Sequence, residues 1–370
     1  MNGQWIAEYT GSNSGSIIVN LDDMGDCYEG VAFLVDKNHK LPALTAGIKT
    51  SDKTRTFQFK TPAIFPINPR TRLVDSWDEV KKFYPEAIIP DQAEVSGDWN
   101  EERLVLSWTT NIGTTGSATL PKSKADAPSE YIPITRDWNG FKEYVARLEG
   151  RRYLFRGQNA PWRLRTNFHR TGRANLGRFL NVDIQTLHKH LSARTRHIFN
   201  LEIPSENGAF FNLVQHHGYP TPLLDWTYSP YAAAFFAYRG ISDSQADTAP
   251  EHHKVRIVVF DQKQWRNDFE TVQILNTAFP HFSIMEFIAI DNERMIPQQA
   301  ASSVTNVDDI ENYIRSKETV EKKYLNVIDL PVKERKKVMR ELSYMGITAG
   351  SLFPGLDGAC EELKERFFDF

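Results

Sequence analysis

The stretch YLFRGQNAPWRLR, residues 153–165, sets an arginine and a glycine at the end of a short apolar run. Its first residues read as the end of a buried strand, and Arg156 and Gly157 follow at once. A guanidinium group offers a planar fork of donors that suits phosphate oxygens, and a buried charge without a partner is costly. The pattern therefore predicts a pocket for an anion, with phosphate as the first candidate. The alternative is a structural ion pair between Arg156 and a carboxylate, for which Asp225 is one choice.

The surroundings of this arginine are basic, although the chain as a whole is not. Residues 151–178 hold eight arginines and no Asp or Glu, whereas the 370-residue chain has a formal net charge of −3. Any attraction to a nucleotide or a nucleic acid must therefore come from a local patch. Arg163 and Arg165 are candidate ligand contacts within this patch, and a solvated basic surface is the alternative for both.

Composition indicates a globular protein of a reducing compartment. Apolar residues make up 41% of the chain and charged residues 25%, which is typical of a domain with a sizeable core. The two cysteines, Cys27 and Cys360, exclude a disulfide framework and a cysteine-rich zinc site. The sequence has neither a signal-peptide pattern nor an apolar run of about 18 residues. We therefore expect a cytoplasmic protein with no membrane partner.

Residues 1–121 predict an all-β domain. Apolar and polar residues alternate there between Gly, Asn and Asp turns, and SGSIIVNL and YEGVAFLV read as neighbouring strands joined by DDMGD. Short, evenly spaced antiparallel strands favour a small barrel or sandwich. Such a domain is a possible sensor or targeting module with a ligand or a protein partner. One helix is expected after Ser76, which can cap it.

A polar segment, residues 122–134, reads as a linker, and residues 135–370 predict a mixed α+β domain. A helix is expected around residues 209–219, and a second, very apolar helix begins with Ser229 as its cap and Pro230 as its first residue. Further strands are expected at HKVRIVVFD (253–261) and SIMEFIAID (283–291). The end segment LFPGLDG (352–358) is expected to pack back on the domain, burying Leu352, Phe353 and Leu356.

Three separated motifs resemble the FRG-domain family of bacteria and phages, which is named for a Phe-Arg-Gly motif. They are YLFRGQ (153–158), QHHGYPTPLLDWTYSPYAAAFFA (215–237) and MGITAGSLFPGLDGA (345–359). The resemblance covers roughly residues 137–370 and leaves out the N-terminal β domain. It implies a fold similar in outline to the ADP-ribosyltransferase fold, with NAD as substrate and no metal. It also implies a toxin or an antiphage defence protein.

What the resemblance implies for individual residues begins with the first two motifs of that fold. Arg156, with Gly157 and Gln158 beside it, matches a strand-end arginine that grips NAD. Residues 225–227 stand where a second motif precedes a helix that packs under the nicotinamide site. The basic loop that follows Gln158 would add further contacts to the nucleotide.

Each residue of the second motif has a functional and a structural interpretation. His216 could act as a general base or contact a ribose, or it could be a satisfied structural histidine; a metal site needs three or four ligands and is not expected. Asp225 could orient its neighbours or accept from a ribose hydroxyl, or it could cap the helix after Ser229. Trp226 could stack on a base or a nicotinamide ring, or belong to the core. Thr227 lies beside the nucleotide site or serves as a helix cap.

The third strand of the resembled fold brings a catalytic Glu or Gln, and this chain offers two candidates. Residues 292–300 are the expected third motif and contain Gln298, although Ala300 replaces the glycine of the family pattern. Glu286, on the strand predicted at 283–291, is the acidic alternative. Either group would stabilise the oxocarbenium-like state that forms at the ribose.

Three functions stay open at this point. The first is a transferase that moves ADP-ribose from NAD to a nucleic acid, a protein or a small molecule. The second is a non-catalytic module that binds a nucleotide or a nucleic acid with salt-sensitive affinity. The third is a phosphodiester hydrolase built on His216, His217 and Asp225.

Overall fold

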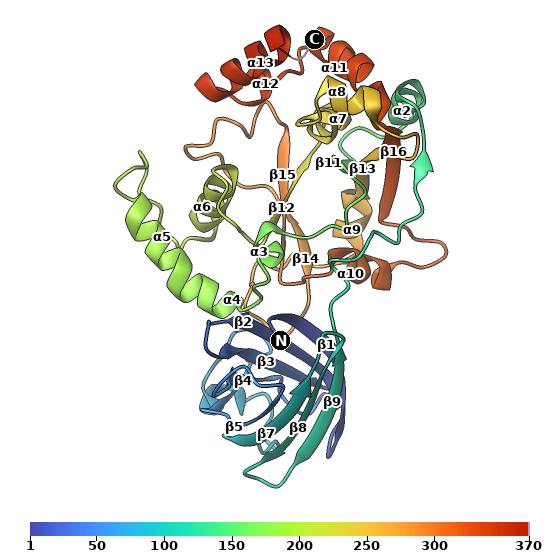
Figure 1. The fold of residues 1–370 in the computed structure, drawn as a ribbon. Helices are drawn as coiled ribbons and strands as arrows, with labels where there is room; N and C mark the ends of the chain where they lie inside the picture. The colour runs from blue at the N-terminus through green and yellow to red at the C-terminus, as the bar shows by residue number, and fades with distance from the viewer. Residues whose placement is uncertain (369–370) are drawn as a thin grey trace.

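The protein is a mixed α+β chain with two separate sheets, and the computed structural model describes residues 1–368 (Figure 1). The first sheet is antiparallel throughout, which confirms an all-β N-terminal region. Its nine strands run in the order β5-β7-β8-β9-β1-β2-β3-β4-β6. The strands are β1 (Gly3–Gly11), β2 (Gly15–Asp23), β3 (Tyr28–Asp36), β4 (Leu44–Lys49), β5 (Thr56–Lys60), β6 (Ile64–Pro66), β7 (Ala93–Trp99), β8 (Arg103–Thr110) and β9 (Thr115–Pro121).

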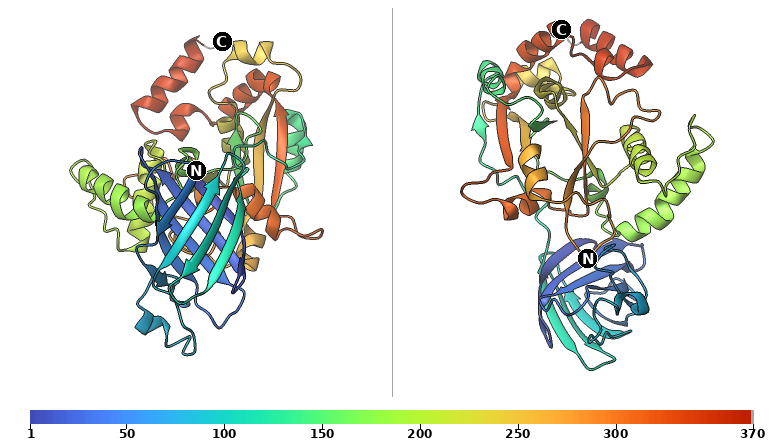
Figure 2. Two further views of the ribbon diagram at one scale, coloured as in Figure 1. Left: turned by 60° about the horizontal axis from the view of Figure 1, so that its bottom comes forward. Right: turned by 180° about the vertical axis from the view of Figure 1, so that it is seen from behind.

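This sheet curls into a half-barrel (Figure 2, left). Its two edge strands, β5 and β6, are consecutive in the chain, so the short segment 61–63 connects opposite edges of the sheet. Alternation then sends every second side chain inward, where Trp5, Ile17 and Leu120 form a core. The one helix in this region is α1 (Trp77–Val80), and Ser76 caps it as predicted.

The second sheet carries the motifs singled out in the sequence. Its order is β10-β16-β13-β11-β12-β15-β14, and only the β10–β16 pair is parallel. Next to the complete β11–β13 ladder, β11 pairs with β12 at a single position, Phe155 opposite Thr227. The two strands therefore part immediately after Phe155, at Arg156. The strands are β10 (Ile134–Thr135), β11 (Tyr153–Gln158), β12 (Leu223–Thr227), β13 (Lys254–Asp261), β14 (Phe282–Met285), β15 (Ala300–Thr305) and β16 (Leu325–Pro331).

Helices cover this second sheet, and α7 (Pro230–Tyr238) is the one that lies closest to β11. Ser229 caps α7 and Pro230 is its first residue, as predicted. The other α-helices are α2 (Trp138–Val145), α3 (Asn167–Arg170), α4 (Leu176–Arg178), α5 (Ile184–Leu191), α6 (Pro204–His216), α8 (Asp243–Thr248), α9 (Gln262–Asp268), α10 (Ile310–Lys317), α11 (Arg335–Tyr344), α12 (Ala349–Leu352) and α13 (Leu356–Phe368). Within residues 1–368, no helix combines the length and the apolar character needed to cross a membrane.

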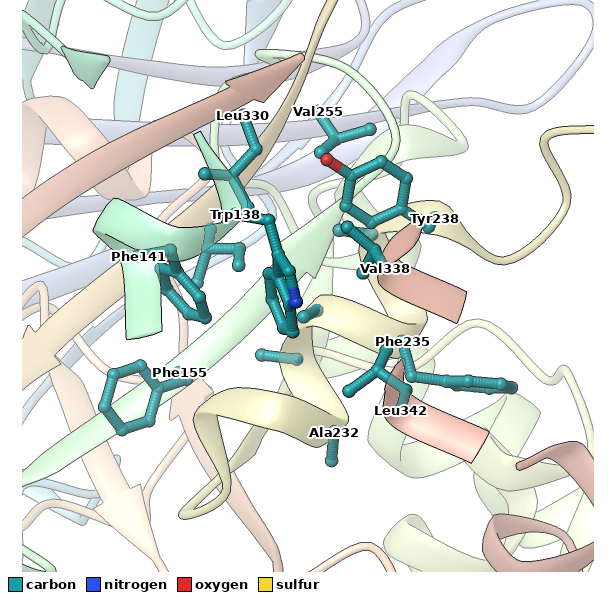
Figure 3. Packing of buried hydrophobic residues seen from close by; sticks show 14 of the residues in the cluster. Trp138, Phe141, Phe155, Ala232, Phe235, Tyr238, Val255, Leu330, Val338 and Leu342 are labelled. Carbon is teal, nitrogen blue, oxygen red and sulfur yellow. The ribbon is translucent and has the colours of Figure 1, made fainter. Parts of the chain in front are cut away.

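The glycine of the Phe-Arg-Gly motif lets α7 approach the sheet. A Cβ atom on Gly157 would lie 1.8 Å from the carbonyl oxygen of Ala233 and 2.6 Å from the amide nitrogen of Ala237. Small residues on α7 serve the same close contact, and Trp138, Phe235 and Leu342 fill the space around the helix (Figure 3). The alanines of α7 and Gly157 of β11 therefore both serve the close contact between this helix and this strand.

The structure corrects two strand predictions. The strand predicted at residues 283–291 stops at Met285, and the third strand expected at 292–300 is a series of turns that leads into β15 at Ala300. Strands β15 and β16 were not predicted. The sequence AASSVT of β15 is rich in Ser and Ala and lacks the Val and Ile run that marks a buried strand.

Buried polar contacts join the half-barrel to the rest of the chain. Gln4 donates from Nε2 to the carbonyl of Asn306 at 2.7 Å, and its Oε1 accepts from the amide of Asp308 at 2.9 Å. Asp22 accepts from Nε of Arg173 at 2.8 Å and from the two backbone amides that follow Arg173. The joint therefore resembles a domain interior more than a flexible tether.

Candidate functional site

A cavity of about 350 Å³ opens where β11 and β12 part. It brings together seven of the residues singled out in the sequence, which come from β11, α6, β12 and the turns before β15: Arg156, Gly157, His216, Asp225, Trp226, Thr227 and Gln298. The other lining residues include Gln215, Arg239, Arg294 and Phe353, which were not assigned to the site from sequence. The parting of the two strands is thus what creates room for a ligand.

Arg156 reaches across the gap between the two strands. Its Nη1 donates to the backbone carbonyl of Asp225 at 2.7 Å, while its buried Nε has no hydrogen-bond partner in the described part of the chain. Burial lowers the pKa of Arg156, and the Asp225 charge opposes that shift. The predicted alternative, an ion pair that uses the Asp225 carboxylate, is not formed by hydrogen bonding, because the guanidinium bonds to the main chain instead.

A short relay holds the Asp225 carboxylate in place. The Thr221 hydroxyl donates to Oε1 of Gln215, and Nε2 of Gln215 donates to Oδ1 of Asp225. All three residues belong to the motif at 215–237, so the Gln and Thr of that motif position its Asp. Oδ2 of Asp225 makes no hydrogen bond to residues 1–368, and Asp225 is a lining residue of the cavity. The role of Gln215 could have been suspected from the sequence, because Gln215 directly precedes His216 in the motif.

Hydrogen bonding fixes the tautomer of His216, which lines the cavity. Nδ2 of Asn292 lies 2.6 Å from Nδ1 of His216 and 2.6 Å from Oδ1 of Asn212. Because an amide nitrogen only donates, Nδ1 is the acceptor and the proton is assigned to Nε2. Burial lowers the pKa of His216, and the Asp225 charge counteracts this in part. This tautomer fits the predicted ribose contact better than the predicted general base.

Gln298 and Thr227 connect the cavity to the C-terminal motif. Nε2 of Gln298 donates to the carbonyl of Leu352 at 2.9 Å, and the Thr227 hydroxyl donates to the Gln298 carbonyl at 2.6 Å. The Thr227 hydroxyl also accepts from the Ser229 amide at 2.9 Å. The carboxamide nitrogen of Gln298 is therefore engaged in the fold.

Phe353, from the C-terminal motif, forms a wall of the cavity between two arginines. The guanidinium of Arg239 lies 4.0 Å from the Phe353 ring centroid, and that of Arg294 lies 5.4 Å from it. Leu352 and Phe353 are buried as predicted, but Leu356 is 83% exposed and its predicted burial is wrong. Leu356 is the first residue of α13, which starts after the chain has turned away from the core.

The charges around the cavity leave it positive. Arg156, Arg239 and Arg294 line it, and Asp225 is the carboxylate among its lining residues. Arg239 forms a two-pronged ion pair with Glu361 of α13, at 2.5 and 2.6 Å. Three guanidinium groups thus face two carboxylates, and the excess positive charge favours an anionic ligand.

Arg163 and Arg165 lie outside this cavity, so their assignment as ligand contacts is corrected. Arg163 pairs with Asp309 at 2.7 Å and with Glu130 at 2.9 Å, and its side chain is 1% exposed. Arg165 pairs with Asp308 at 2.5 Å and also with Asp126. The local sequence contains no acidic residue, and these partners come from the segment before β10 and from beyond β15.

Three more predicted residues take structural positions. Gln158 is buried and donates to the carbonyl of Trp162 at 2.7 Å, away from the cavity. Trp226 lines the cavity, but its indole lies in the core and donates to Ser303 at 3.0 Å, so it does not offer a stacking face. Glu286 accepts from the hydroxyl of Tyr228 at 2.5 Å on the surface and is not a lining residue, because β14 ends before it.

A larger hollow of about 760 Å³ adjoins the cavity and shares His216 and Arg294 with it. It lies beside the ends of α5 and α6, and His217 lines it rather than the cavity. The set of His216, His217 and Asp225 is therefore not assembled in one pocket. No three His, Cys, Asp or Glu side chains of residues 1–368 are arranged as metal ligands.

Comparison with known proteins identifies the central part of the chain. The FRG domain family model matches residues 151–246, which include Arg156, His216 and Asp225. No curated protein matches. Among solved structures, a redesigned β-barrel, mFAP1, bound to DFHBI is 12% identical, with 33% of this chain and 94% of that chain covered and a TM-score of 0.23. Residues 151–246 of this chain are therefore an FRG domain.

Proposed function

We propose that the cavity binds a phosphate-bearing nucleotide and that the protein is an ADP-ribosyltransferase-like enzyme with NAD as its substrate. The observation that carries the proposal is the buried Nε of Arg156, which has no partner among residues 1–368. A buried guanidinium donor without an acceptor costs free energy, and a phosphate oxygen supplies that acceptor. The excess positive charge and a volume of about 350 Å³ suit part of a dinucleotide.

The chemistry we assign to the cavity is cleavage of the bond between nicotinamide and ribose. Nicotinamide leaves with the bonding electron pair, and the nucleophile of the acceptor forms a bond to the ribose carbon. The free oxygen of the Asp225 carboxylate takes the proton that the nucleophile loses, and Nε2 of His216 donates to a ligand oxygen. The charge that develops on the ribose is stabilised by the same carboxylate. The acceptor, a nucleic acid or a protein, would approach through the adjoining hollow.

This activity would serve a toxin or an antiphage defence protein that acts in the cytoplasm, with the half-barrel as its sensor or targeting module. That role rests on the resemblance described above.

A second function, binding without turnover, is favoured by one specific observation. The Gln298 carboxamide donates to Leu352 at 2.9 Å, and Glu286 lies outside the cavity. Neither candidate for the third catalytic residue therefore has the placement that the transferase chemistry would require. A nucleotide-binding module needs only the arginines and the donors of the first two motifs.

One experiment separates these functions. Purified protein is incubated with NAD and with total nucleic acid or cell lysate, nicotinamide release is measured by chromatography, and the Tm is measured with NAD, ADP-ribose and ADP. The variant is Arg156→Ala, and the matched control is Arg151→Ala, an exposed arginine two residues before the YLFRGQ motif.

We expect nicotinamide release and a ligand-dependent rise in Tm, both lost in Arg156→Ala and both kept in Arg151→Ala. A rise in Tm without release would replace the transferase by the binding module. A folded protein with neither response to any of the nucleotides would refute both.

A further inference from the structure

We propose that the interior of the N-terminal half-barrel binds a small, mainly apolar molecule, of benzene to indole size, that carries one hydroxyl or amino donor. This site lies outside the FRG domain and does not depend on the function proposed above. The proposal is argued from a cavity, from the small inward-facing residues that make room for it, and from a polar pair in its wall.

The cavity lies inside the half-barrel and has a volume of about 160 Å³. Its walls are apolar side chains from several strands, including Ile17, Leu34, Ile48, Phe59 and Leu106. Protein interiors contain few voids larger than a water molecule. An apolar cavity of about 150 Å³ engineered in another protein stays dry and binds benzene. The half-barrel thus has the space and the lining for one small aromatic molecule.

Small residues at inward positions create this space. Ala32 of β3 pairs with Ala46 of β4, so two methyl groups stand side by side where neighbouring inward positions hold Ile or Leu. Ala93 of β7 is a third small residue in the lining. A barrel of this size can fill its interior with large side chains, and here it does not.

A hydrogen-bonded polar pair, Tyr9 and Asp36, lies in the mainly apolar wall. The Tyr9 hydroxyl donates to Oδ2 of Asp36 at 2.9 Å, and the Asn38 amide donates to Oδ1 of Asp36 at 2.7 Å. Both Tyr9 and Asp36 line the cavity, and the Trp108 ring stands edge-on to Tyr9 with 5.7 Å between ring centroids. Burial raises the pKa of Tyr9, as does its bond to Asp36, so the phenol keeps its proton.

This pair presents acceptors to the cavity. Because the Tyr9 proton already points to Asp36, the phenol oxygen and the carboxylate can only accept a further hydrogen bond. A ligand with a hydroxyl or amino donor at one end satisfies them, whereas an anionic ligand would face the Asp36 charge. The site therefore selects a neutral or cationic donor on an apolar body.

The cavity is reached from the end of the half-barrel that faces away from the second sheet. Its lining includes residues of the β1–β2, β3–β4 and β8–β9 turns, and Ile88 and Ile112 at this end are 75% and 40% exposed. The opposite end carries Gln4 and Asp22, which fasten the half-barrel to the rest of the chain. A ligand can thus enter without disturbing the joint.

The test uses the full chain with three probes: p-cresol, indole and toluene. Binding is measured by calorimetry and by the rise in Tm. p-Cresol and toluene share an apolar body, and p-cresol adds a donor, so we expect p-cresol to bind up to about tenfold more tightly, which corresponds to one net hydrogen bond. Tyr9→Phe should reduce this preference and leave toluene binding in place.

A filled cavity provides the second arm of the test. Ala46→Phe should abolish binding of all three probes, with Ala46→Leu as a milder variant if the Phe variant does not fold. Thr119→Phe, on an exposed position of β9, is the matched control and should bind as the unchanged protein does. Binding that survives a folded Ala46 variant, or no binding of any probe at millimolar concentration, would overturn the proposal.

Discussion

Replacing the glycine of the Phe-Arg-Gly motif by alanine tests the packing that shapes the cavity. In Gly157→Ala the new Cβ atom would lie 1.8 Å from the Ala233 carbonyl oxygen and 2.6 Å from the Ala237 amide nitrogen. Both obstacles are backbone atoms of α7, so no change of rotamer relieves the overlap. The helix must move away from β11, and the close packing around it is lost.

We expect this overpacking to lower the free energy of unfolding by about 3 kcal/mol, the upper part of the usual range, because the clash is with the main chain. The Tm should fall by roughly 4–6 °C, measured by calorimetry or circular dichroism. Since Gly157 lines the cavity beside Arg156, any ligand-dependent rise in Tm should also weaken.

Gly150→Ala is the matched control, because no atom lies within 4 Å of the Cβ it would add. Alanine there should change the free energy of unfolding by less than about 1 kcal/mol. Trimming α7 by Ala233→Gly should not rescue Gly157→Ala, since the carbonyl remains. The close-approach argument would be refuted if the Tm of the Gly157→Ala protein equalled that of the unchanged protein. It would also be refuted if Ala233→Gly restored the Tm of Gly157→Ala.

Two further predictions concern buried charges. Asp22→Ala removes an acceptor of Arg173 and of two backbone amides, and it should lower the free energy of unfolding in urea by about 3 kcal/mol. Asp26→Ala, at an exposed position just after β2, should change this free energy very little, and equal effects of the two variants would contradict the role of the joint. Burial lowers the pKa of His169 and of His281 to about 4 in the folded protein. The unfolded chain therefore takes up protons first, and stability should fall as the pH drops from about 6.5 to about 4; a Tm that is flat over this range would show that these imidazoles titrate normally.

The sequence predicted those features of the structure that depend on residues close together in the chain. Ser229 and Pro230 begin α7 because a hydroxyl cap and a fixed proline φ act within one turn. The motif residues of β11 and β12 converge on one cavity because each lies near the start or end of an element that the pattern predicts.

Contacts between segments that lie far apart in the chain could not be predicted from the sequence. Arg163 finds Asp309, 146 residues away, and Arg165 finds Asp308, 143 residues away, so the basic run looked free when it is paired. Strand β15 was missed for a related reason, since its Ser and Ala side chains gain their burial from the neighbouring strands. Gln298 was expected on a strand, but β15 begins only at Ala300, two residues later.

The segment 122–134 has a consequence for how the two halves of the chain can communicate. Asp126 holds Arg165, and Glu130 holds both Arg163 and Arg315. Together with the buried contacts of Gln4 and Asp22, these ion pairs hold the half-barrel against the FRG domain. A molecule inside the half-barrel is therefore expected to act without swinging that module toward or away from the FRG domain. Its effect would instead pass as a small shift through the contacts of the joint. One of these contacts leads from Gln4 to Asp308, just beyond β15, and β15 pairs with β12, the strand that carries Asp225.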